Sequence, residues 1–168
     1  MTTLYLVRHG ETVDNVRQIM QGQTQGELND EGRRQARELG AQLASEHFDA
    51  ILSSDLRRAV QTAEILAQPH GLGLVTTPLL RERDWGDFTG RFIPELKGEK
   101  WPPNVESKGQ LMERAGRFLD FVRTNYDGLT VLAVGHGIIN KAVQAVFHGK
   151  HLHEIEKMGN AELRILHL

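Results

Sequence analysis

Two histidines of this chain each stand beside a glycine at the end of an apolar run. His9 follows Arg8 and the apolar segment Leu4–Val7, and a glycine comes next. His136 lies between two glycines after the apolar segment 129–134. Short unbroken apolar runs are typical of strands buried on both faces, and open α/β sheets bind ligands beyond the carboxyl ends of their strands. An imidazole beside a guanidinium in such a crevice suits an anionic ligand, phosphate above all.

A third strand end leads into a pair of arginines. The run Ser53–Ala63 (SSDLRRAVQTA) places Arg57 and Arg58 in the first turns of a predicted helix, where the helix dipole already favours an anion. An arginine there can hold a phosphate through two parallel hydrogen bonds. Adjacent helical residues point about 100° apart, so we expect only one of the two to face a site. Further along, Glu82 begins a segment punctuated by glycines and offers a carboxyl group for acid–base chemistry.

Two other polar groups give weaker signals. Asn15 and Gln21 can donate amide hydrogens to an anion, although such residues more often satisfy the local backbone. His148, His151 and His153 are close in sequence, but they lie in a turn without a carboxylate scaffold. We interpret them as a solvated loop rather than a metal site, and we expect neither a metal nor a cofactor.

The bulk properties of the sequence exclude several classes of protein. The chain has 168 residues, about the size of one ordinary domain, and a formal net charge of -2. The absence of cysteine excludes a thiol nucleophile, a disulfide framework and a Cys-ligated zinc. No broad basic surface indicates nucleic acid, no apolar run reaches the roughly 18 residues of a membrane helix, and the first residues do not form a signal peptide. We therefore expect a cytoplasmic protein that binds neither nucleic acid nor a membrane.

The elements that must position these residues alternate along the chain. Asn29 or Asp30 is expected to cap the first long helix, and Ser54 or Asp55 the second. Residues 79–103 show little periodicity, as in a long functional or mobile loop. The pattern predicts strands at 4–7, 48–53, 74–76, 129–134 and 162–168, helices at 31–46, 56–67, 107–125 and 138–147, and a loop with room for one helical turn at 13–27. This order predicts an α/β fold with a largely parallel sheet.

Taken together, the motifs resemble the histidine phosphatase superfamily, also called phosphoglycerate mutase-like. The matching segments are Leu6–Thr12 with Asn15, Ser53–Ala63, Leu80–Glu82 followed by Gly86 and Gly90, and Val134–Gly137. They cover nearly the whole chain in the right order. The resemblance implies a three-layer α/β/α fold and a single domain over 1–168, with a short lid at about 83–106.

The resemblance also implies a role for each matched residue. His9 matches the nucleophile that takes the phosphoryl group on a ring nitrogen, and Glu82 matches the proton donor to the leaving oxygen. Arg8, Arg58 and His136 match the pocket that holds the phosphoryl oxygens. The pocket lining is further matched by Asn15 and, less closely, by Gln21 and Gly22. Elementary electrostatics agrees, because a nucleophilic imidazole must be uncharged and neighbouring guanidinium groups favour that form.

The implied activity is hydrolysis of small phosphate monoesters, with two alternatives. Family mutases carry extra segments between the glutamate and the second histidine, and this stretch is short here, which favours a phosphatase. Against that, Glu82–Gly86 faintly resembles the mutase pattern Glu-Arg-x-Tyr-Gly, with Trp85 in place of tyrosine. A non-catalytic phospholigand sensor is the alternative of another class, although a sensor needs neither nucleophile nor acid.

Charged and aromatic residues near the predicted lid are candidates for contacts with the substrate. Four cations near the predicted lid can meet a second acidic group on the substrate, although solvated surface is the plainer interpretation of each: Arg83, Arg91, Lys97 and Lys100. Three aromatic residues can stack on a base or sugar or can simply pack in a core: Trp85, Phe88 and Trp101. The expected partner is a small phosphate ester. The oligomeric state stays open, with a homodimer through the last strand as one option.

Overall fold

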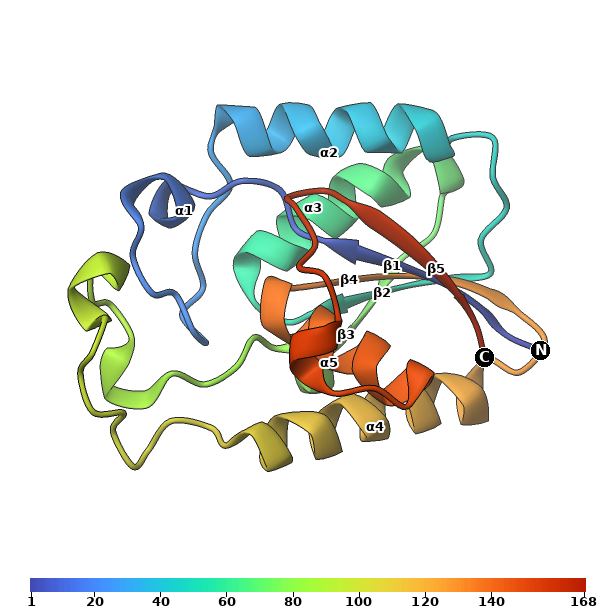
Figure 1. The fold of residues 1–168 in the computed structure, drawn as a ribbon. Coiled ribbons are helices and arrows are strands. Elements are labelled where there is room, and N and C mark those ends of the chain that lie inside the picture. Colours follow the sequence, from blue (N-terminus) through green and yellow to red (C-terminus); the bar gives the residue numbers. More distant parts are fainter.

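The computed structural model describes residues 1–168 and is built on a five-stranded sheet (Figure 1). The strands are β1 (Thr3–Arg8), β2 (Ala50–Ser54), β3 (Leu74–Thr77), β4 (Thr130–Gly135) and β5 (Leu163–His167). Their order across the sheet is β3-β2-β4-β1-β5. All neighbours pair in parallel except β5, which runs antiparallel to β1 at one edge. The predicted α/β class with a largely parallel sheet is therefore confirmed.

Helices cover both faces of this sheet, which gives the three layers. The helices are α1 (Val13–Arg17), α2 (Asp30–Leu43), α3 (Arg57–Ala67), α4 (Lys108–Asn125) and α5 (Gly137–His148). Figure 1 shows α2 and α3 on one face and α4 and α5 on the other. Single 3₁₀ turns occupy Gln68–His70 (η1), Pro78–Leu80 (η2), Gly86–Phe88 (η3), Ile93–Leu96 (η4) and Leu152–Glu154 (η5). None of the helices combines the length and the apolar character needed to cross a bilayer.

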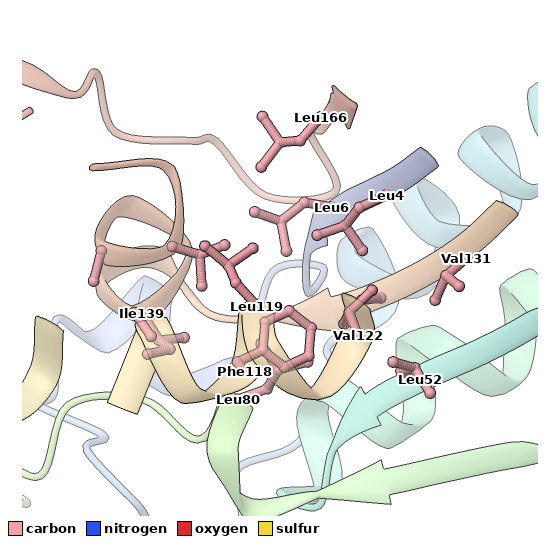
Figure 2. Close-up of a cluster of buried hydrophobic side chains, with 14 of the residues drawn as sticks. Leu4, Leu6, Leu52, Leu80, Phe118, Leu119, Val122, Val131, Ile139 and Leu166 are labelled. Atoms are coloured by element: carbon pink, nitrogen blue, oxygen red, sulfur yellow. The ribbon is translucent and has the colours of Figure 1, made fainter. Parts of the chain in front are cut away.

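The sheet separates two apolar cores, so its central strands are buried on both faces. Leu4 and Leu6 of β1 pack with Phe118 of α4 in the larger cluster, which Figure 2 shows between the sheet and α4–α5. Val7 of the same strand contributes instead to the cluster under α2 and α3. Phe118 is fully buried, and truncation of such a side chain to alanine costs about 3–5 kcal/mol. The two cores hold the carboxyl ends of β1 and β4 in register.

The start of α3 differs from the prediction that Ser54 or Asp55 caps it. The residue at the N-cap position is Leu56, which has no side-chain capping bond. Asp55 is engaged elsewhere, because its two carboxylate oxygens accept from Arg81 at 2.7 and 2.6 Å. Gln25 takes over the first turn, with its side-chain oxygen accepting the N–H of residue 57 at 3.0 Å. The helix start is thus fixed by a distant loop rather than by a local cap.

Two glycines bring the loop after β1 against the start of α2. A Cβ atom on Gly10 would lie 2.5 Å from the carbonyl oxygen of Gly32, and a Cβ on Gly32 would overlap the backbone of Glu11. Glu11 also accepts a bond from the side-chain amide of Asn29, the N-cap of α2, at 2.9 Å. Only glycine at both positions permits this approach. The close approach of these two backbones thereby fixes the position of His9, the residue between β1 and Gly10.

Candidate active site

The two predicted histidines come together because their strands are neighbours. Arg8 pairs with Gly135 in the parallel register of β1 and β4, so the residues that follow emerge side by side. The ring centroids of His9 and His136 lie 5.0 Å apart. Both side chains are buried. A cavity of about 240 Å³ opens at this point, and its lining includes Arg8, His9, Arg58 and Glu82.

His9 presents one unprotonated ring nitrogen. Its Nδ1 lies 2.7 Å from the carbonyl oxygen of Gly10, which can only accept, so Nδ1 carries the proton and Nε2 keeps its lone pair. Burial, followed by the charges of Arg58 and Arg8, holds the pKa of His9 well below its usual value. The imidazole is therefore neutral at neutral pH, as a nucleophile requires.

The two arginines of the cavity have no carboxylate partner. Arg8 donates from Nη1 to the carbonyl of Met158 at 2.8 Å, and Arg58 donates from Nη2 to the carbonyl of Gly22 at 2.8 Å. Arg58 also donates to the carbonyl of Thr24. The Nε atoms of both arginines are buried without any hydrogen-bond partner. Buried donors are normally paired, and a buried charge without a counterion is costly, so the cavity is arranged to receive an anion.

Burial of Arg58 has a measurable consequence for its acidity. Its side chain is 1% exposed. Desolvation lowers the pKa of Arg58 to about 10, with the charge of Glu82 acting in the opposite direction. The guanidinium still carries its charge at neutral pH, and no carboxylate lies within ion-pair distance of it.

His136 supplies a third unpartnered donor. Its Nε2 lies 2.8 Å from Oγ of Ser54, and that hydroxyl already accepts the N–H of Leu56 at 3.2 Å. We assign the hydroxyl proton to the bond with Nε2, which places the ring proton on Nδ1. Nδ1 is buried and has no partner. Burial, and then the charge of Arg58, holds the pKa of His136 well below its usual value, so the ring is a neutral donor.

Glu82 lies across the cavity at the start of α5. Its Oε1 accepts the N–H groups of Arg83 and Ile139, both at 2.9 Å, and its Oε2 accepts the N–H of Ile138 at 3.0 Å. His136, at the N-cap position, provides no side-chain cap, so Glu82 fills that role. A carboxylate is stabilised at a helix amino terminus by the helix dipole. The glutamate is thereby fixed at the cavity that His9 also lines.

The backbone of Glu82 is supported from behind. Arg114 of α4 donates to the carbonyls of Leu79 and Arg81 and forms an ion pair with Glu106 at 2.8 Å. Its Nη2 also reaches the carbonyl of Glu82 at 3.3 Å. These bonds tie the loop after η2 to α4.

The other predicted pocket residues line the same cavity but have mainly local bonds. Asn15 closes a capping box with Thr12 at the start of α1, and Gln21 accepts from the hydroxyl of Thr12 at 3.1 Å. Gly22 provides the carbonyl that binds Arg58. All three line the cavity. Helix α1 itself, predicted only as room for one turn, is a definite helix with this box at its amino end.

The cations predicted near the lid lie away from the cavity lining. Arg83 is buried, with its guanidinium 4.9 Å from the ring centroid of Trp85 and 5.0 Å from that of Trp101. Arg91 forms an ion pair with Glu99 at 3.0 Å. Lys97 and Lys100 are exposed. The two tryptophans pack edge-to-face at 5.3 Å, so packing within the 83–106 segment explains these aromatic residues, although Trp85 also lines the cavity.

Two residues that the sequence did not suggest complete the surroundings. Lys157 lines the cavity, and Asn160 donates from its side-chain amide to the carbonyl of His9 at 3.2 Å. Both lie in the irregular segment between α5 and β5, which has no motif and no periodicity. Only the three-dimensional return of the chain to β1 brings them to the site.

The alternative metal site does not form. The structure contains no group of three or more His, Cys, Asp or Glu side chains placed to hold a metal ion. The rings of His151 and His153 stack at 5.5 Å, and that of His148 packs against Phe147. Two of the three histidines therefore contact each other, and the third packs against a different ring.

Comparison with known proteins assigns the family. The model of the histidine phosphatase superfamily (branch 1) matches residues 4–168. The chain belongs to this superfamily. It is 40% identical over 141 residues to the uncharacterized phosphatase PhoE of Bacillus subtilis (strain 168), covering 82% of this chain and 72% of that protein. It is also 36% identical over 152 residues to the probable phosphoglycerate mutase GpmB of Yersinia pestis, covering 82% of this chain and 71% of that protein.

Solved structures agree with this assignment. Bacillus stearothermophilus YhfR superposes on this histidine phosphatase with a TM-score of 0.93 and 31% identity, covering 100% of this chain and 92% of that one. A mycobacterial glucosyl-3-phosphoglycerate phosphatase in complex with VO3 gives a TM-score of 0.88 and 28% identity, covering 98% and 92%. The enzyme class predicted from the motifs, histidine phosphatase, is confirmed.

Proposed function

We propose that this enzyme hydrolyses phosphate monoesters of small metabolites through a phosphohistidine intermediate on His9. One observation carries the proposal. Two guanidinium groups without an ion-pair partner, those of the half-buried Arg8 and the buried Arg58, flank an imidazole whose Nε2 is free, and the Nε atoms of both are buried without a hydrogen-bond partner. A phosphoryl dianion can accept hydrogen bonds from the unpartnered donors and offset both charges. The free ring nitrogen is the nucleophile that can attack its phosphorus atom.

In the first step, Nε2 of His9 attacks phosphorus and the bond from phosphorus to the ester oxygen breaks. The arginines and the Nδ1–H of His136 bind the oxygens on which charge develops. Each unit-charge contact at about 4 Å contributes about 4 kcal/mol at an effective dielectric near 20, and each 1.36 kcal/mol is about tenfold in rate. These groups therefore account for several orders of magnitude of the rate of phosphoryl transfer.

Glu82 provides the proton that an alkoxide leaving group needs. Its Oε2 accepts only one backbone N–H, whereas Oε1 accepts two, so Oε2 is the oxygen with room to carry the proton. After the alcohol leaves, water attacks the phosphohistidine, and its proton passes to Glu82. Inorganic phosphate is released, and both His9 and the protonated glutamate return to their starting forms.

The scheme requires no metal ion and no cofactor, so activity should be unchanged after treatment with EDTA. We also propose that residues 1–168 act as one domain, with the 83–106 segment as a short lid over the cavity. The inferred partner is the phosphate ester alone, and a cytoplasmic location is part of the same proposal. A pocket under so short a lid admits water to the intermediate, which favours hydrolysis over return of the phosphoryl group.

A screen of phosphate release from small phosphorylated metabolites tests the proposal. We expect release by the wild-type protein and none above background by the His9→Ala variant. The Arg57→Ala variant is the matched control, since Arg57 is exposed beside the buried Arg58. Phosphate release retained by pure, folded His9→Ala protein would overturn the assignment.

Phosphoglycerate mutase activity is the second candidate, favoured by the likeness to GpmB. Incubation with 3-phosphoglycerate and a trace of bisphosphoglycerate separates the two. We expect phosphate to appear, and rapid formation of 2-phosphoglycerate without phosphate would favour the mutase. A phospholigand sensor, the alternative of another class, would bind p-nitrophenyl phosphate without releasing p-nitrophenol.

A further inference from the structure

One cation of the cavity is not used by the proposed reaction. Lys157 lines the same cavity as Arg8 and Arg58, and no carboxylate lies within ion-pair distance of its ammonium group. It comes from the segment between α5 and β5, whereas the residues assigned to the reaction come from the strand ends, the start of α3 and the loop after η2. Its presence therefore needs a separate explanation.

The backbone on both sides of Lys157 is anchored, and this places the residue at the cavity. Ile155 and Met158 on either side are buried. The carbonyl of Glu156 accepts from Arg164 at 2.8 Å, and the carbonyl of Met158 accepts from Arg8 at 2.8 Å. The anchored backbone thus fixes the position from which the exposed Lys157 side chain extends along the edge of the cavity.

Lys157 lies directly beside Arg8. Cε of the lysine and Cζ of the arginine both lie 3.4 Å from the point where Gly137 would carry a Cβ atom. Lys157 is exposed at the edge of the cavity, and partial desolvation, followed by the charge of Arg8, lowers its pKa below its usual value. Two cations that share one corner of a cavity repel each other, and an anion at that corner relieves the repulsion.

One cation of the cavity is left without an assigned anionic partner. Three cations line it, namely Arg8, Arg58 and Lys157. On the proposed function, Arg8 and Arg58 bind the reacting phosphoryl group, which leaves Lys157 free for another anion. We propose that Lys157 binds a second anionic group of the substrate, a carboxylate or a second phosphate on the same small molecule.

Two matched pairs of substrates test this inference. Glycerol 3-phosphate and 3-phosphoglycerate differ by a carboxylate, and fructose 6-phosphate and fructose 1,6-bisphosphate differ by a phosphate. For Lys157→Met, we expect kcat/KM for the more acidic member of at least one pair to fall about 10- to 100-fold further than for its partner. Lys157→Arg should restore much of the preference. Lys150→Met, which removes an exposed lysine outside the cavity, should change neither ratio.

The outcomes separate this inference from the function on which it rests. If Lys157→Met leaves the ratio unchanged in both pairs, the inference is overturned, and an equal loss for all four esters would instead assign Lys157 to the reacting phosphoryl group. If the wild-type protein releases phosphate from none of these four esters and from no ester of the wider metabolite screen, the proposed function fails and this inference fails with it. A shift of the ratio in the first pair alone identifies a carboxylate, and in the second pair alone a phosphate.

Discussion

Replacement of Arg58 by methionine removes one of the two unpaired guanidinium groups while keeping a long side chain. Arg58 is 1% exposed and keeps its charge, since its pKa is lowered only to about 10. Loss of one unit-charge contact with the phosphoryl group costs about 4 kcal/mol at about 4 Å and an effective dielectric near 20. We therefore expect kcat/KM to fall about 10³-fold.

The same substitution should move the acid limb of the pH profile. The charge of Arg58 is the second cause, after burial, of the lowered pKa of His9. His9 must be neutral to attack, so activity is lost as the pH falls through its pKa. Removing Arg58 raises that pKa, and the acid limb of kcat/KM should shift to higher pH. Arg58→Lys keeps a positive charge and should leave the limb closer to its wild-type position.

The neighbouring Arg57 provides a matched control. Its side chain is 60% exposed and its ion pair with Glu27 spans 3.4 Å at the surface, where such pairs contribute little. Arg57→Met should change kcat/KM less than about twofold. The assay is p-nitrophenyl phosphate hydrolysis from about pH 4 to pH 9, with thermal unfolding to verify that each variant is folded. Equal effects at positions 57 and 58, or a loss below tenfold for folded Arg58→Met, would refute the reasoning.

Three further predictions follow from the geometry. Glu82→Gln should slow alkyl phosphates about 10²- to 10³-fold and p-nitrophenyl phosphate much less, and equal slowing across a leaving-group series would count against an acid role. Gly10→Ala places a Cβ atom 2.5 Å from a backbone oxygen, whereas nothing lies within 4 Å of a Cβ at Gly73. Urea unfolding should therefore show that the free energy of unfolding falls by about 2 kcal/mol or more for Gly10→Ala and changes little for Gly73→Ala. The hydrogen bond from Arg81 holds the pKa of Asp55 below its usual value. This ion pair therefore stabilises the fold at pH values above the usual Asp pKa of about 4, and its contribution is lost as the pH falls through the lowered pKa. Asp55→Asn should therefore cost up to about 1 kcal/mol near pH 7, and chemical unfolding at low pH should show the difference from wild type disappearing; a constant difference at all pH values would contradict it.

The strands were predictable because a strand that is buried on both faces consists of consecutive apolar residues. The run Leu4–Val7 contains no polar residue, and the structure buries its members in two separate cores. The strand ends then located His9 and His136, since parallel neighbours finish at the same edge of the sheet. Helix geometry predicted that only one of Arg57 and Arg58 faces the site, and the family resemblance implied that it is Arg58.

Contacts made through tertiary structure left no such mark. Asn160 bonds the carbonyl of His9 across about 150 positions of sequence, and Lys157 enters the cavity from a segment without periodicity. The start of α3 was mispredicted because Asp55 is taken by Arg81 and Gln25 reaches in from another loop. Local capping rules describe side chains free to bond their own helix, and these were already committed to other partners.

Nε2 of His9 is proposed to accept the phosphoryl group, and a rapid-quench experiment with a ³²P-labelled ester detects this transfer. Enzyme in excess is mixed with the ester, quenched at alkaline pH within milliseconds, digested and mapped. We predict an acid-labile label on the peptide that contains His9, appearing before labelled phosphate and absent from His9→Ala protein. Label on another residue, or complete turnover without any labelled peptide, would contradict the account.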